Sequence, residues 1–130
     1  MVALVLVSHS PRLAEGLAEL LSQLGAGDVP VRLAAGTADG QLGTDPIAVE
    51  DAISAADGGH GVVVLPDLGS AVLSVKVALE ELDEAVRDRV RLVDAPFVEG
   101  AVAAAVTAST GADLAAVAAA AEQARIIRKL

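Results

Sequence analysis

The sequence predicts a three-layer α/β sandwich built on a mostly parallel sheet. Short apolar runs of strand length recur four times, and segments with helical spacing of apolar residues separate them. This alternation is typical of α/β domains, in which helices connect parallel strands. A length of 130 residues fits one domain. We therefore expect a single domain over residues 1–130, with a weakly defined tail from about residue 122 to 130.

The amino-terminal half contains two predicted strand–helix units. Residues 2–7 are continuously apolar, as in a strand that is buried on both faces, and residues 31–35 read as a second strand. Between them lies a predicted helix that Gly25 ends. Five leucines are expected on one face of this helix: Leu13, Leu17, Leu20, Leu21 and Leu24. A polar loop after the second strand leads to Asp45, which caps a further helix with Pro46 at its first position.

The carboxyl-terminal half continues the alternation. Residues 61–65 and 90–93 form the third and fourth predicted strands. One helix is expected between them, and five apolar residues mark its buried face: Val72, Val75, Leu79, Leu82 and Val86. The remainder is alanine-rich and predicted to be helical, with a break at residues 109–111 and a restart near Asp113.

Composition and charge narrow the possible functions. The formal net charge of −9 argues against a nucleic-acid binder and favours partners with a basic docking face. No cysteine is present, so the chain has neither disulfides nor a thiolate metal site, and we expect a cytoplasmic protein. The first apolar run lacks the basic flank of a secretory signal, and no run has the length of a membrane span. No nucleotide-binding glycine motif is present, and we expect neither a cofactor nor a metal.

The predicted topology brings polar residues together at one edge of the sheet. Ligands of open α/β sheets bind beyond the carboxyl ends of the strands, where the strand order reverses. With strand order 2-1-3-4, the first and third strands are neighbours, and His9 and Asp67 face each other at this point. The second histidine, His60, enters the third strand from the opposite edge. We expect it to be a surface or strand-start residue.

This pair of residues suits phosphoryl transfer. A neutral imidazole nitrogen can attack phosphorus when the other ring nitrogen is protonated and held, and the Asp67 carboxylate can hold it. Backbone amides at predicted helix starts, near Ser10 and Gly69, can bind the phosphoryl oxygens. Four hydroxyls can add contacts: those of Ser8, Ser10, Thr37 and Ser70.

A structural interpretation of the same residues stays open. Ser10 is well placed to be only a helix cap, and Asp67 and Ser70 are common turn and cap residues of strand-to-helix loops. A histidine in a loop is usually just solvated. From the residues alone, a phosphate or anion site and an ordinary set of loop residues both remain possible.

Four segments resemble the DhaM family, the phosphotransfer subunits of the phosphoenolpyruvate-dependent dihydroxyacetone kinases. The amino-terminal domain of this family is similar to the mannose-type EIIA domain of the sugar phosphotransferase system. The segments follow in order through nearly the whole chain: LVSHSPRLAEGLAELL, AAGTADGQLGTD, VLPDLGSAVLSVKVALE and DAPFVEGAVAAAV. The resemblance implies a parallel sheet in order 2-1-3-4 and a homodimer.

The resemblance also implies roles for individual residues and partners. His9 would be transiently phosphorylated, with Asp67 as its hydrogen-bonded carboxylate. Four residues would surround the phosphoryl group: Gly36, Thr37, Gly69 and Ser70. Phospho-HPr would be the donor, and ADP on the DhaL subunit the acceptor, so that the regenerated ATP phosphorylates dihydroxyacetone bound by DhaK. Some family members carry HPr-like domains after the first domain. This chain ends at Leu130, which implies a separate donor protein.

Other functions fit parts of the sequence. Sugar-specific mannose-type EIIA domains usually carry a tryptophan shortly after the aspartate; here DLGSA is closer to the dihydroxyacetone branch. Small tetrapyrrole metal chelatases also place a histidine after the first strand, in a GHGSR-like context, whereas this chain has SHSPR and too few nitrogen ligands at that edge. A non-catalytic regulatory binding module is the third alternative.

Overall fold

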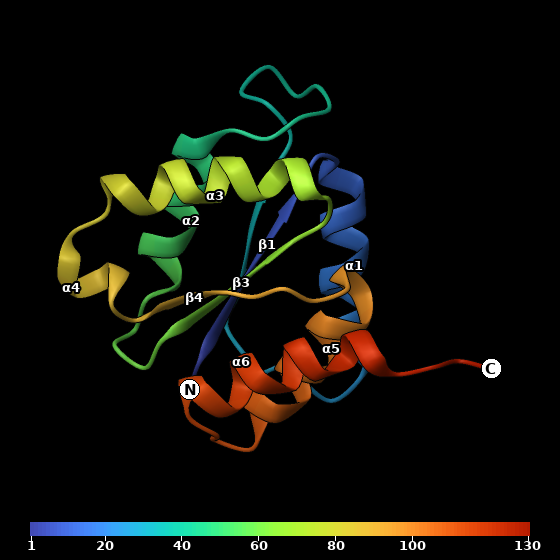
Figure 1. Ribbon diagram of the computed structural model, residues 1–130. Helices are drawn as coiled ribbons and strands as arrows, with labels where there is room; N and C mark the ends of the chain where they lie inside the picture. The colour runs from blue at the N-terminus through green and yellow to red at the C-terminus, as the bar shows by residue number, and fades with distance from the viewer.

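Four parallel strands form one sheet in the order β2-β1-β3-β4 in the computed structural model, which describes residues 1–130 (Figure 1). The strands are β1 (Ala3–Ser8), β2 (Val31–Ala35), β3 (Val62–Pro66) and β4 (Val90–Leu92). The helices are α1 (Pro11–Gln23), α2 (Pro46–Ala56), α3 (Gly69–Glu81), α4 (Glu84–Arg87), α5 (Phe97–Ser109), α6 (Leu114–Gln123) and the short 3-10 helix η1 (Ala124–Ile126). The predicted sandwich and strand order are confirmed.

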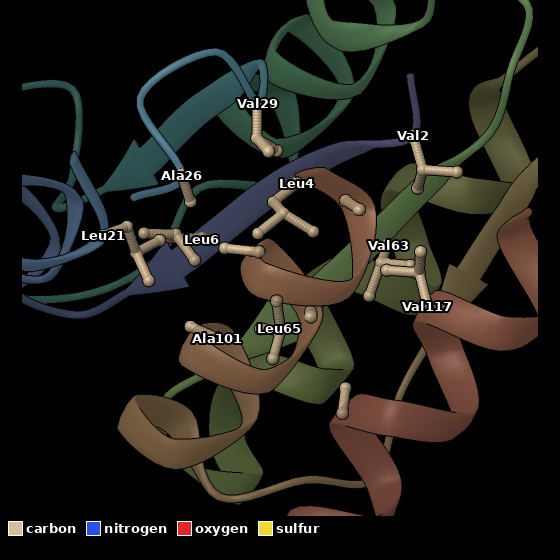
Figure 2. Close-up of a cluster of buried hydrophobic side chains, with 14 of the residues drawn as sticks. Val2, Leu4, Leu6, Leu21, Ala26, Val29, Val63, Leu65, Ala101 and Val117 are labelled. Atoms are coloured by element: carbon tan, nitrogen blue, oxygen red, sulfur yellow. The ribbon is translucent and has the colours of Figure 1, made fainter. Parts of the chain in front are cut away.

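The sheet has a separate hydrophobic core on each face. Because successive side chains of a strand point to opposite faces, the apolar run of β1 divides between the two cores. Leu4 and Leu6 pack with α1, α5 and α6 on one face. Figure 2 shows this cluster, in which Leu21, Ala101 and Val117 come from the three helices. On the other face, alternate residues of β1 and β3 pack against α2 and α3: Ala3, Val5, Val7, Val62 and Val64. Both faces of the central strands are therefore covered by helices.

The buried face of α1 differs from the predicted one. Ala14, Leu17 and Leu21 are buried, whereas three of the five predicted leucines are between 40% and 48% exposed: Leu13, Leu20 and Leu24. The buried stripe of this helix therefore runs through Ala14, Leu17 and Leu21. Helical spacing correctly predicted a helix here, but it did not identify which of two overlapping apolar stripes is covered.

The segment predicted as one helix after β3 is two helices. α3 ends at Glu81, and Leu82 is extended and buried, so that only three of the five predicted apolar residues lie in α3. Arg87 of α4 closes this helix end: its guanidinium donates hydrogen bonds to the carbonyls of Leu79, Glu80 and Leu82 at 2.7, 3.3 and 2.7 Å. These bonds satisfy carbonyls that a helix end otherwise leaves without partners.

The other predicted helix ends are confirmed. The side chain of Asp45 accepts a hydrogen bond from the N–H of Ile47, and Pro46 occupies the first turn of α2. Asp113 caps α6 in the same way, and the alanine-rich segment breaks after Ser109 as expected. None of these helices is both long and apolar enough to span a membrane.

Candidate active site

The carboxyl ends of β1 and β3 meet at the reversal point of the strand order. Val7 lies opposite Pro66 in the parallel register, and the N–H of Asp67 donates to the carbonyl of Val7 at 2.9 Å. The chain therefore leaves both strands side by side, first through His9 and then through Asp67. The predicted juxtaposition of these two residues is confirmed.

Asp67 receives four hydrogen bonds, two on each carboxylate oxygen. Its Oδ1 lies 2.9 Å from Nδ1 of His9 and accepts from the N–H of Leu68 at 2.7 Å. Its Oδ2 accepts from the backbone N–H of His9 at 2.9 Å and from the hydroxyl of Ser8 at 3.0 Å. Only 7% of the Asp67 side chain is exposed, against 26% for His9. The carboxylate is thus held in one orientation, while the histidine ring keeps an open side.

These contacts keep Asp67 ionised. Burial acts to raise the pKa of Asp67, but the hydrogen bonds from the backbone and ring of His9, from Ser8 and from Leu68 together outweigh it and lower the pKa below the ordinary value. An ionised carboxylate can only accept hydrogen bonds. The proton between Asp67 and His9 therefore belongs to Nδ1 of the imidazole.

The other ring nitrogen of His9, Nε2, is left without a proton. With the proton on Nδ1, a neutral imidazole carries a lone pair on Nε2. The hydroxyl of Ser70 lies 2.8 Å from Nε2 and donates to this lone pair. An imidazole whose one nitrogen is protonated and held by a carboxylate, while the other carries a lone pair, has the arrangement of an activated nucleophile.

The start of α3 offers an anion site beside this nitrogen. No side chain caps α3, and the backbone N–H groups of Gly69 and Ser70 have no acceptor within the protein. Free amides at the positive end of a helix dipole favour a phosphate oxygen. The arrangement can therefore bind a negatively charged group close to the nucleophile.

The remaining predicted site residues have hydroxyls or amides that are already in use. Ser8 is buried and bonded to Asp67, and the Ser10 hydroxyl accepts from the N–H of Leu13 as the cap of α1. The Thr37 hydroxyl donates to Asp39 within its own loop. The N–H of Gly36 donates to the carbonyl of Ser8 at 3.1 Å. The hydrogen bonds of these residues hold the loops around the carboxyl end of β1.

Two backbone hydrogen bonds at the site could not be predicted from the sequence. The N–H of Gly43 donates to the carbonyl of His9 at 2.9 Å, and the N–H of Leu68 donates to Asp67. Both are backbone groups, so no residue type reveals them. A third contact, 2.6 Å between the hydroxyls of Thr44 and Ser74, links the loop after β2 to α3.

The second histidine takes no part in the site. His60 is exposed and lines a hollow with Val2 and Asp113 at the amino ends of the strands, as its place in the sequence predicted. No three histidine, aspartate or glutamate side chains lie close enough together to hold a metal ion.

Comparisons with known proteins match this chain to the EIIA-man family model and to DhaM subunits. The family model EIIA-man, described as PTS system fructose IIA component, matches residues 3–118. The phosphoryl donor subunit DhaM of the PEP-dependent dihydroxyacetone kinase of Klebsiella michiganensis is 49% identical over 118 residues, which cover 88% of this chain and 25% of that subunit. The Escherichia coli DhaM subunit is equally similar, with the same coverage. This chain therefore spans about a quarter of the length of these two relatives.

A shorter relative and a solved structure match over most of their own length. Subunit DhaM of PEP-dependent dihydroxyacetone kinase 2 of Listeria innocua is 40% identical over 106 residues, which cover 82% of this chain and 85% of that subunit. The crystal structure of EF1359, a protein of unknown function, superposes with a TM-score of 0.86 at 40% identity. The match covers 94% of this chain and 93% of that chain.

Proposed function

The chain belongs to the EIIA-man family, and from this premise we propose that it is the phosphohistidine carrier of a phosphoenolpyruvate-dependent dihydroxyacetone kinase. His9 takes a phosphoryl group on Nε2 and passes it on. The observation that carries the proposal is the contact between Nδ1 of His9 and the ionised carboxylate of Asp67, which leaves the Nε2 lone pair to react. Relatives named as phosphoryl donor subunits support the choice of pathway.

In the first step, the lone pair on Nε2 of His9 attacks the phosphorus of a phosphohistidine on the donor protein, HPr. A new nitrogen–phosphorus bond forms as the donor's own nitrogen–phosphorus bond breaks, and the donor nitrogen keeps the bonding electron pair. The proton on Nδ1 stays in place, so the phosphorylated ring carries a positive charge. Asp67 stabilises this charge, because its carboxylate lies in hydrogen-bonding contact with Nδ1.

The incoming phosphoryl group displaces the Ser70 hydroxyl from Nε2. The hydroxyl is then free to donate to a phosphoryl oxygen, together with the backbone N–H groups of Gly69 and Ser70. Catalysis of phosphoryl transfer consists mainly of such positioning and charge stabilisation. Gly36 lies beside the site, where its N–H donates to the carbonyl of Ser8 at the end of β1, and Thr37 follows it.

In the second step, a terminal phosphate oxygen of ADP on DhaL attacks the phosphorus. The nitrogen–phosphorus bond of His9 breaks, and its electron pair returns to Nε2, which regenerates the neutral ring. The ATP so formed phosphorylates dihydroxyacetone that is bound by DhaK. The chain then has no small-molecule substrate of its own.

We further propose that the chain works as a homodimer in the cytoplasm. Sedimentation analysis of the purified chain measures whether it is a dimer.

The test is a phosphorylation assay read by intact mass. The purified chain and its His9→Ala variant are mixed with phosphoenolpyruvate, enzyme I and HPr, and then with DhaL carrying ADP. We expect one acid-labile phosphoryl adduct on the unaltered chain only, which DhaL discharges. An adduct that DhaL leaves in place would move the acceptor to a sugar phosphotransferase system, as in the fructose system after which the family model is described. A chain that takes up no phosphoryl group would refute the carrier function.

A further inference from the structure

Ser8 is a buried polar residue in the otherwise apolar strand β1. Of the 39 buried residues, it is the only polar one, and no part of it is exposed. It is the last residue of β1, whose other five residues, 3–7, are all apolar and buried. A buried hydroxyl costs free energy unless it is hydrogen-bonded, and alanine would suit this strand without that cost. The hydroxyl therefore needs an explanation beyond packing.

Both hydrogen-bonding capacities of this hydroxyl are directed by its neighbours. The N–H of Ser10 can only donate, and it lies 3.1 Å from Oγ of Ser8. The ionised carboxylate of Asp67 can only accept, and its Oδ2 lies 3.0 Å from the same Oγ. The single hydroxyl proton thus points to Asp67. None is left for a phosphoryl oxygen, although the sequence had suggested that contact.

This proton fixes the rotation of the Asp67 carboxylate. The outer torsion of an aspartate is soft, so the direction of its oxygens is set by their partners. Ser8 and the backbone N–H of His9 hold Oδ2, and with Oδ2 held, Oδ1 lies 2.9 Å from Nδ1 of His9. Loss of the Ser8 hydroxyl leaves Oδ2 with one donor instead of two. It also leaves the N–H of Ser10 without an acceptor at the start of α1.

We propose that Ser8 is a positioning residue for phosphoryl transfer: its buried hydroxyl orients Asp67 against Nδ1 of His9 and so keeps the reactive lone pair on Nε2. This inference rests on the proposed function for its relevance to catalysis. Ser8 acts through Asp67 and does not touch the transferred group.

The first experiment measures the ring of His9 without any phosphoryl donor. Nitrogen-15 shifts of the imidazole report which nitrogen carries the proton, in the unaltered chain and in Ser8→Ala, Ser8→Thr and Ser8→Cys. We expect the form protonated on Nδ1 to dominate in the unaltered chain and in Ser8→Thr, which keeps a hydroxyl. In Ser8→Ala the form protonated on Nε2 rises. If Ser8→Ala does not fold, Ser8→Cys keeps the side-chain shape, slightly enlarged, with only a weak donor and is expected to show the same rise.

The second experiment measures the rate of phosphorylation of His9 from phospho-HPr and from phosphoramidate, a small-molecule donor. We expect Ser8→Ala to be slower by about tenfold with both donors, as for loss of a hydrogen bond to a charged group, with an unchanged KM for phospho-HPr. Ser8→Thr restores most of the rate. Val62→Ala weakens the core that packs against α2 and α3, at the amino end of β3 and so away from the site, and serves as the control for lost stability, with an unchanged rate.

Two results would overturn the proposal. One is a Ser8→Ala chain with the protonation pattern and rate of the unaltered chain. The other is an unaltered protonation pattern with slower transfer, which would assign Ser8 a direct contact with the phosphoryl group. Failure of the carrier function has a different signature, because then the unaltered chain takes no phosphoryl group from phospho-HPr. The protonation measurement still decides the role of Ser8 in that case.

Discussion

Nδ1 of His9 and Oδ1 of Asp67 lie 2.9 Å apart, although 58 positions separate the two residues along the chain. The parallel pairing of β1 with β3 creates this contact, because it brings the carboxyl ends of both strands to the same edge of the sheet. The contact sets the protonation of the histidine and leaves the lone pair on Nε2, beside the hydroxyl of Ser70 in the first turn of α3. The predictions below test this site and the fold that supports it.

Asp67→Asn should slow phosphorylation of His9 by about 10- to 100-fold, because a hydrogen bond to a charged group is replaced by a neutral one. Circular dichroism should show an intact fold. The rate is measured by rapid quenching after mixing with phospho-HPr. The matched control is Asp94→Asn, at the end of the neighbouring strand, where 89% of the side chain is exposed. Equal rates for Asp67→Asn and the unaltered chain would remove the assigned role of Asp67.

Ser70→Ala should make the phosphohistidine shorter-lived and transfer slower, by about tenfold, because the hydroxyl next to Nε2 no longer reaches the phosphoryl group. The lifetime of the adduct on His9 is followed by intact mass after the donor is removed. Ser22→Ala removes a hydroxyl that bonds only to a carbonyl of α1 and is the control. An adduct as stable in Ser70→Ala as in the unaltered chain would contradict this prediction.

Gly36→Ala should destabilise the chain more than Gly40→Ala. Both glycines have positive φ, of 76° and 82°, so both substitutions carry a backbone cost of about 1–2 kcal/mol. At Gly36 the new methyl group would also lie 2.9 Å from Cγ of Pro11 and 3.1 Å from the carbonyl of Gln41, whereas Gly40 has open space. We expect a further loss of about 1–3 kcal/mol at Gly36 from this overpacking. Urea unfolding measures both variants, and equal losses would contradict the close packing of Gly36 on Pro11.

Asp57 should contribute to stability at neutral pH and lose this contribution in acid. Arg89 donates two hydrogen bonds to its carboxylate, at 3.1 and 2.6 Å, and these lower the pKa of Asp57 although burial acts to raise it. A carboxyl whose pKa is lower in the folded state stabilises fully above its unfolded pKa of about 4, and the contribution disappears as the pH falls through the folded pKa.

Asp57→Asn should therefore have a lower urea midpoint than the unaltered chain at pH 7, and the two midpoints should converge as the pH falls below about 4. Asp51→Asn changes the charge equally at an exposed position of α2 and is the control. A difference between Asp57→Asn and the unaltered chain that stays constant down to low pH would contradict the role of the Arg89 contact.

The helix starts and the strands could be predicted because their causes are local. Asp45 and Asp113 cap helices through hydrogen bonds within three residues of themselves. The apolar runs identified all four strands, most clearly β1 and β3, which are buried throughout and therefore need almost no polar residues. The juxtaposition of His9 and Asp67 also followed, once parallel strands were assumed in the order 2-1-3-4.

Longer-range contacts decided the features that the sequence did not reveal. Which stripe of α1 is buried depends on the strands and helices that pack against it, and α3 ends where Arg87 of the next helix reaches its carbonyls. No residue near Ser8 in the sequence indicates that its hydroxyl donates to Asp67, which lies 59 positions further along the chain. The sequence by itself determined the sandwich, the strands and the two residues that meet at its edge, because periodicity and capping act over a few residues. Only the tertiary structure decided which nitrogen of His9 carries the lone pair. This depends on the four hydrogen-bond donors that hold the carboxylate of Asp67 against Nδ1.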